Sequence, residues 1–146
     1  MRVLVQRSGK AKVTVDEKVV GSIYSGLMLL VGFTEGDDLD AVKHLAKKVV
    51  NLRIFPDEND VMNKSLLDFG GDILSISQFT LYADTKKSNR PSFTASMGGS
   101  EAIVLYKKFN EILNSVYGIN TLPGVFGAHM DLDIMCDGPV TITLEA

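Results

Sequence analysis

The sequence predicts one α/β domain, spanning residues 1–146, with several strands and two helices. A chain of 146 residues has the length of a single domain and can bury a sizeable core. Its composition, 45% hydrophobic and 23% charged, is ordinary for a globular protein. Segments with apolar residues at every second position alternate with two segments of helical spacing. No repeat, low-complexity tract or linker separates them.

The N-terminal quarter of the chain predicts strands. Apolar and polar side chains alternate within residues 3–5 and 11–15, which indicates two early strands. Residues 16–18, Asp-Glu-Lys, predict a turn into a third strand over 19–24. The continuous apolar run at 27–33 is typical of a strand that is buried on both faces.

A helix is predicted over residues 39–50, where apolar side chains recur at helical spacing and the lysines point mostly outward. Either Asp37 or Asp38 can cap its N-terminus. The helix should end before a strand-like segment at 52–55, which Pro56 stops.

The middle of the chain predicts a strand and a second helix. Residues 56–71 are polar and rich in turn formers, and 73–83 are the next strong strand candidate. The loop 84–92 leads to a helix over about 100–117, whose apolar positions share one face. Gly118 suits the C-terminal end of that helix.

The C-terminal part predicts a loop at 121–127 and two final strands, at 130–135 and 140–144. Gly138-Pro139 stands at the joint between these strands. Both residues are poor in strands, because proline has no N–H to donate and glycine has no side chain to pack. Pattern alone interprets this dipeptide as a turn.

The formal net charge of −3 gives no support to nucleic-acid binding, but the basic residues are grouped. Each of three groups is free of acidic residues. Such groups either converge into a patch that meets phosphates or form solvated faces, and both interpretations stay open. The groups are Arg2, Arg7, Lys10 and Lys12; Lys43, Lys47, Lys48 and Arg53; and Lys86, Lys87 and Arg90.

Several features point to the cytoplasm. No run of eighteen apolar residues predicts a membrane span, and the N-terminal apolar stretch is too short for a secretory signal. Cys136 is the single cysteine, which excludes an intramolecular disulfide and fits a reducing compartment.

Ordinary hydrolytic machinery is hard to find in the sequence. His44 is expected at the surface of the first helix. His129 would be the base of a conceivable triad, with Ser77 or Thr80 as nucleophile and Asp133 as orienter. Nothing in the spacing favours that triad, because no nucleophile-elbow motif is present.

Metal and nucleotide motifs are not found either. One cysteine and two distant histidines do not resemble a zinc-site pattern. The acidic residues 37–40 also serve as a helix start, where negative charge suits the helix dipole. Neither GxxxxGK[ST] nor a strand-linked GxGxxG occurs. We therefore expect neither a metal nor a cofactor.

Two motifs carry a resemblance to a known family. SQFTLYAD at 77–84 and DGPVT at 137–141 resemble the signature pair of the D-aminoacyl-tRNA deacylases. The resemblance runs through the whole chain: MRVLVQR at 1–7, KKSNRPSF at 86–93 and FGAHM at 126–130 also match. Two motifs in the right order with matching flanks are specific.

The resemblance implies an enzyme that hydrolyses the ester between a D-amino acid and the terminal ribose of tRNA. Glycine mischarged on alanine tRNA is a further expected substrate. The implied fold is a single domain with a mainly antiparallel or mixed, barrel-like sheet and two main helices. The implied assembly is a homodimer, and no membrane is involved. A non-catalytic nucleic-acid-binding protein on the same fold is the alternative.

The resemblance also answers the question that Gly138-Pro139 raises. In the family this bond is cis, and the dipeptide enters the active site of the other subunit, where its backbone would reject L-aminoacyl groups. Arg7 resembles an arginine that braces this element. Cys136 departs from the family, which commonly has asparagine there, so a supporting side-chain amide is lost.

The SQFT segment would form the floor of the site. Ser77 and Gln78 are expected to order water or ribose, and backbone N–H groups near Phe79 and Thr80 to stabilise the oxyanion. Thr80 as the nucleophile is an alternative. The resemblance further implies phosphate contacts from a last set of residues, Lys86, Lys87 and Arg90.

Overall fold

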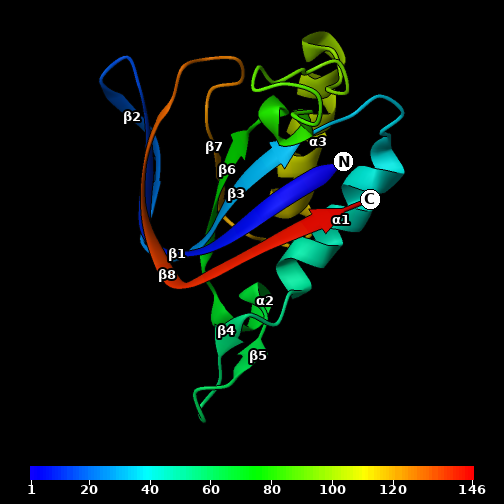
Figure 1. The fold of residues 1–146 in the computed structure, drawn as a ribbon. Helices are drawn as coiled ribbons and strands as arrows, with labels where there is room; N and C mark the ends of the chain where they lie inside the picture. Colours follow the sequence, from blue (N-terminus) through cyan, green and yellow to red (C-terminus); the bar gives the residue numbers. More distant parts are fainter.

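The computed structural model describes residues 1–146, which form a mixed α/β domain with a nearly closed, barrel-like sheet (Figure 1). The main sheet has the order β2-β1-β3-β6-β7, and β8 pairs with β1. This confirms the predicted fold class. The elements are β1 (Arg2–Val15), β2 (Lys18–Ile23), β3 (Gly26–Gly32), α1 (Leu39–Asn51), β4 (Phe55–Pro56), β5 (Met62–Lys64), α2 (Leu66–Phe69), β6 (Asp72–Ser77), the 3₁₀ helix η1 (Phe79–Tyr82), α3 (Gly99–Ser115), β7 (Thr121–Pro123) and β8 (Asp131–Glu145).

The prediction of two early strands is wrong, because they form one strand, β1. The first half of β1 pairs with β3, and its second half pairs with β2. β8 follows β1 along both halves, with register shifts around Ser8 (Figure 1). The gap in alternation between residues 5 and 11 therefore marks a change of partner and irregular pairing, and the chain does not break there.

The prediction of two final strands is also wrong. Residues 131–145 form the single strand β8, and Gly138-Pro139 lies inside it. Gly138 has a φ of 116°, and the bond between Gly138 and Pro139 is cis, as the resemblance implied. The chain bends at this dipeptide and keeps its direction along β1, so the turn interpretation fails.

The core has two parts, one on each face of β3. Side chains such as Leu27, Leu29 and Val31 pack toward α1 and α3, together with the buried Leu45 and Phe109. Alternate side chains fill the concave side of the sheet; they include Met28, Leu74 and Ile76. The expected strand at 27–33 is thus buried on both faces: it lies between the antiparallel β1 and the parallel β6, helices cover one face, and side chains of other strands cover the other.

The helices α1 and α3 confirm the two helices that the spacing of apolar residues predicted. The Asp38 side chain caps α1 by accepting from the backbone N–H groups of Asp40 and Ala41. Asp37 instead pairs with the N-terminal amine of Met1 and accepts from the Thr34 N–H. No helix of the chain is long and apolar enough to cross a membrane.

Four segments differ from the prediction, and the first is the expected loop at 121–127, which begins with the strand β7. The strand at 73–83 ends at Ser77, because β3, its partner, ends at Gly32, and the chain then turns into η1. Of the strand expected at 52–55 only Phe55 is in β4, and Pro56, which was expected to stop that strand, is its second residue. The segment 56–71 contains β5 and α2, a short helix with a Ser65–Asp68 capping box that turn-forming residues concealed.

Candidate active site

A pocket of about 310 Å³ lies beside the carboxyl ends of the parallel strands β3 and β6. Its size is at the lower end of the range for small-molecule sites. Ser77, Gln78 and Phe79 lie on one side of it, and residues 126–130 lie on another. The rest of the lining is mainly apolar and includes Val31, Phe33, Ile76, Met97, Ala102 and Leu132.

The SQFT segment turns the chain from β6 into η1 at this pocket. The Gln78 N–H donates to the Val31 carbonyl at 2.7 Å, which is the last bond to β3 before the chain leaves the sheet. Phe79 and Thr80 then occupy the first turn of η1. Amide groups in the first turn of a helix have no acceptor within that helix. Their position makes them suitable donors to an oxyanion.

Residues far along the chain hold η1 in place. The Ser96 hydroxyl donates to the Phe79 carbonyl at 2.9 Å, and Arg2 Nη1 donates to the Leu81 carbonyl. The Arg2 guanidinium also lies 4.7 Å from the centre of the Tyr82 ring. Burial raises the pKa of Tyr82 to about 12, so this phenol stays protonated at neutral pH.

Gly32 lets the SQFT segment approach β3 closely. A Cβ atom at this position would lie 2.8 Å from the Gln78 carbonyl oxygen, a contact that real Cβ atoms essentially never make. Neither Gly32 nor the anchors Arg2 and Ser96 were identified as parts of the site from the sequence. The signal was weak, because glycine often ends an apolar run, and a single arginine or serine has no distinctive spacing.

The side chain of Thr80 faces a donor. Gln78 Nε2 donates to Thr80 Oγ1 at 2.6 Å. A neutral amide cannot accept a proton from the hydroxyl, so this contact does not activate Thr80 as a nucleophile.

The conceivable triad does not form. His129 lies at the pocket with its side chain 92% exposed, and its Nε2 is 3.6 Å from Asp131. Asp133, the predicted orienter, pairs with Lys12 at 3.2 Å. That part of the triad interpretation is therefore wrong. His44, on α1, is exposed as expected.

Gly138 and Pro139 are exposed, and Arg7 contacts the bend that they form. Arg7 Nε lies 2.9 Å from a carboxylate oxygen of Asp137 and also donates to the Asp137 carbonyl. Arg7 Nη1 donates to the Ile54 carbonyl at 2.6 Å, and the guanidinium lies beside Gly138. Arg7 thus touches the Gly-Pro bend within one chain.

The bend lies far from the pocket of its own chain. Gly138 neighbours Arg7 on β1, and the ladder pairs Arg7–Leu27 and Leu27–Ile73 place it level with Ile73. Ser77 is four residues further along β6, about 13 Å along the strands. Three strand spacings of about 4.8 Å separate β8 from β6 across the sheet. Neither Gly138 nor Pro139 lines the pocket.

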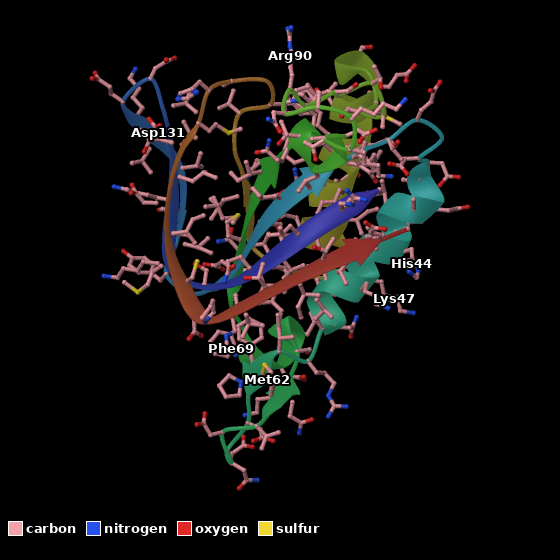
Figure 2. The ribbon with its side chains drawn as sticks, in the orientation of Figure 1. His44, Lys47, Met62, Phe69, Arg90 and Asp131 are labelled. Atoms are coloured by element: carbon pink, nitrogen blue, oxygen red, sulfur yellow. The ribbon has the colours of Figure 1, made fainter.

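The third basic group lies near the pocket. Lys86, Lys87 and Arg90 are exposed on the loop that follows η1, and Arg90 projects from the molecule (Figure 2). The loop returns to the site through Phe93, whose ring meets that of Phe79 edge-on at 5.1 Å. None of these three cations forms a salt bridge within the chain.

The Cys136 thiol is exposed and lies in β8 opposite Ser8. The chain has no cluster of three or more His, Cys, Asp or Glu residues that could hold a metal ion.

The sequence is similar to known proteins over its whole length. The sequence profile described as D-Tyr-tRNA(Tyr) deacylase matches residues 4–145. A D-aminoacyl-tRNA deacylase of Clostridium botulinum (strain Langeland / NCTC 10281 / Type F) is 51% identical over 146 residues, covering 100% of this chain and 97% of the relative. One of Listeria monocytogenes serotype 4a (strain HCC23) is 54% identical, with coverage of 100% and 96%.

Two solved structures are similar as well. A structure named c-Myc DNA Unwinding Element Binding Protein has a TM-score of 0.95 at 38% identity, covering 100% of this chain and 99% of the other. A probable eukaryotic D-amino acid tRNA deacylase has a TM-score of 0.85 at 19% identity, with coverage of 99% and 98%, which shows a shared fold. From the profile match and the identity to its relatives, the chain belongs to the D-Tyr-tRNA(Tyr) deacylase family.

Proposed function

We propose that this protein hydrolyses the ester that joins a D-amino acid to the terminal ribose of tRNA. The observation that carries the proposal is the pocket, which is lined by Ser77, Gln78 and Phe79 and has no activated side-chain nucleophile. Thr80 follows in η1 and does not line the pocket itself. An aminoacyl ester is already activated relative to an amide. Holding it in place, positioning water and stabilising an oxyanion therefore suffice. The names of the relatives support this activity.

The step is an attack of water on the ester carbonyl. The water oxygen bonds to the carbonyl carbon, and the carbonyl oxygen takes negative charge that the amides of Phe79 and Thr80 stabilise. Collapse of this intermediate breaks the bond to the ribose oxygen, which receives the proton that the attacking water has lost. Ser77 and Gln78 order the water or the ribose, and the adjacent ribose hydroxyl of the substrate assists. The products are a free D-amino acid and tRNA.

Chiral selection is assigned to Gly138 and Pro139 of a second copy of the chain. The bend is exposed and lies at the far end of the sheet from its own pocket, so a dimer is needed to unite them. Exposed apolar side chains around this end, among them Met62 and Phe69 in Figure 2, support burial against a partner. Backbone carbonyls of the bend would bind the substrate α-amino group.

Such a wall would collide with an L-side chain and leave room for a D-side chain. It would also accept glycine, which makes glycine mischarged on alanine tRNA a second substrate. A wall of backbone suits this task, because no side-chain rotation relaxes it. Lys86, Lys87 and Arg90 would meet phosphates near the acceptor end, and we place the protein in the cytoplasm.

The test is hydrolysis of matched D-tyrosyl-tRNA and L-tyrosyl-tRNA by the wild type and by Thr80→Ala. We expect rapid loss of the D-ester alone and a rate within about tenfold in the variant, because the Gln78 amide is no base. Equal hydrolysis of both esters would refute the Gly-Pro filter. Abolished activity in Thr80→Ala would restore threonine as the nucleophile.

A second candidate is a nucleic-acid-binding protein without hydrolytic activity. The similarity at TM-score 0.95 to a protein named for binding a DNA unwinding element favours it. It predicts that a dimeric preparation binds nucleic acid and hydrolyses neither ester. Titrating the protein with the unwinding-element DNA and with tRNA, beside the ester assay, separates the two candidates.

A further inference from the structure

An open groove of about 460 Å³ lies along the C-terminal half of α1. His44, Lys47, Lys48 and Asn51 recur at helical spacing, which places them on one stripe, and Arg53 follows the helix. Figure 2 shows His44 and Lys47 projecting outward from α1. No acidic residue lines the groove.

No side chain of the groove forms a salt bridge within the chain, and Arg53 Nε donates to the Asn63 carbonyl at 2.8 Å. Lysines elsewhere have partners: Lys12 with Asp133, Lys64 with Glu58 and Lys108 with Glu111. Lys47 and Lys48 have none.

A cation near a helix C-terminus interacts favourably with the helix dipole, and this explains Lys48 in the last turn. It does not explain why Arg53, beyond the helix, completes an acid-free concave surface. Such a surface is complementary to a chain of phosphates.

The groove is mechanically connected to the Gly-Pro bend. Ile54 follows Arg53 directly, and the Ile54 carbonyl accepts from the same Arg7 that holds Asp137. One arginine side chain therefore links the bend to Ile54, the residue that follows the groove in the chain. When Gly138 of one subunit caps the pocket of another, the groove of that first subunit is brought toward the capped pocket.

We propose that this groove binds the phosphate backbone of the tRNA whose aminoacyl end occupies the pocket of the partner subunit. The inference rests on the proposed function for its substrate and its dimer. One subunit then supplies the pocket and the loop with Lys86 and Arg90. The other supplies the Gly-Pro bend and the groove with Lys47 and Lys48.

The first test measures binding of uncharged tyrosine tRNA to the full-length protein at several salt concentrations. The variant is Lys47→Gln/Lys48→Gln, and the matched control is Lys18→Gln/Lys107→Gln, which removes two exposed and unpaired lysines elsewhere. We expect the groove variant to raise Kd roughly tenfold or more near 0.15 M salt. We also expect the slope of log K against log salt to shrink by about 1.5, since each phosphate contact contributes about 0.7–0.9.

Two results of that test would overturn the inference. One is a Kd and a salt slope that match those of the control. The other is a groove variant that weakens dimerisation and leaves tRNA affinity unchanged, which would make the groove a subunit contact. Because the tRNA is uncharged, this binding test does not depend on hydrolysis. A wild type that fails to hydrolyse D-tyrosyl-tRNA while its groove variant loses tRNA affinity would refute the function and support the groove.

The second test asks which subunit supplies the groove, using mixed dimers purified through two different tags. With Gly138→Ala in one chain and the groove variant in the other, the only properly capped pocket has a neutralised groove, so KM for D-tyrosyl-tRNA should rise. With both changes in one chain and the wild type as its partner, the capped pocket has an intact groove, and KM should stay near the wild-type value. Equal KM values in the two arrangements, or the reverse order, would overturn the assignment.

Discussion

The pocket and the Gly-Pro bend differ in how complete each one is within a single chain. The pocket has apolar walls, and the turn of backbone amides in η1 begins beside it. The bend at Gly138 is firmly held but exposed, and nothing in its own chain lies in front of it. Under the proposed function, the pocket of one copy would supply the chemistry of the site, and the bend of a second copy would supply its selectivity.

Both regions are fastened to the same strand. Arg2, at the start of β1, holds η1 through the Leu81 carbonyl, and Arg7, five residues later, holds the bend through Asp137. A strand in the middle of a sheet is a rigid support, so each motif is positioned with respect to the other. Changes at Arg2 and at Arg7 should therefore affect different properties of the enzyme.

The largest effect is expected from Gly138→Ala. The new Cβ would lie 2.9 Å from the Val140 side chain and 3.2 Å from Arg7 Nη2, at a φ of 116° that L residues rarely adopt. A backbone shift of about 1 Å at the bend should lower D-tyrosyl-tRNA hydrolysis about 100-fold and weaken D/L selectivity. Rates with both esters measure this.

Gly99→Ala, where an added Cβ meets nothing within 4 Å, is the control for Gly138→Ala and should match the wild type. Unchanged selectivity in Gly138→Ala would contradict the role of the bend.

Arg7→Met should also lower D-ester hydrolysis, because it removes the contacts that hold the Gly-Pro bend. It keeps an unbranched apolar stem but removes the guanidinium, and with it the ion pair to Asp137 and the bond to the Ile54 carbonyl, which is left without its partner. We expect a loss of about 1–3 kcal/mol in unfolding free energy and a roughly tenfold lower rate. Urea unfolding and D-ester kinetics measure the two effects.

Lys12→Met removes an exposed ion pair to Asp133 and should cost less than about 1 kcal/mol. If Arg7→Met were as mild as this control, Arg7 would not brace the bend.

Gly32→Ala tests the other region. Its Cβ would press on the Gln78 carbonyl from 2.8 Å, so the pocket floor must shift while Gly138 stays in place. We expect a destabilisation of about 1–3 kcal/mol and a rate roughly tenfold lower, with the ratio of D-ester to L-ester hydrolysis unchanged. A changed ratio would show that the pocket itself selects chirality. Gly98→Ala, in open space, is the control.

His129→Ala should have the smallest effect. The imidazole is 92% exposed and has only a distant carboxylate partner, at 3.6 Å from Asp131. We expect a rate within about threefold of the wild type, because a general base would contribute about 100-fold or more. A loss of that size, measured with D-tyrosyl-tRNA across pH 6–8, would return the histidine to the mechanism.

Much of the fold followed from local pattern. The spacing of apolar residues identified α1, α3 and the doubly buried β3, because residues that face the core recur at the period of the helix or strand that contains them. Pattern failed where a strand is irregular: it divided β1 at residues 6–10, where β1 changes partners, and β8 at Gly138, where β8 bends. The helix α2 has four residues, which are too few to show a helical spacing of apolar side chains.

The sequence by itself determined the family, through SQFTLYAD and DGPVT, and it determined which side chains face the core. Only the tertiary structure decided that these two motifs lie at opposite ends of one sheet, and that Arg2, Gly32 and Ser96 hold the pocket floor. The physical reason is that periodicity reports the environment of each residue, whereas register and strand order decide which distant residues meet. Register and strand order depend on pairing between residues that are distant in the sequence, and local sequence patterns do not report that pairing.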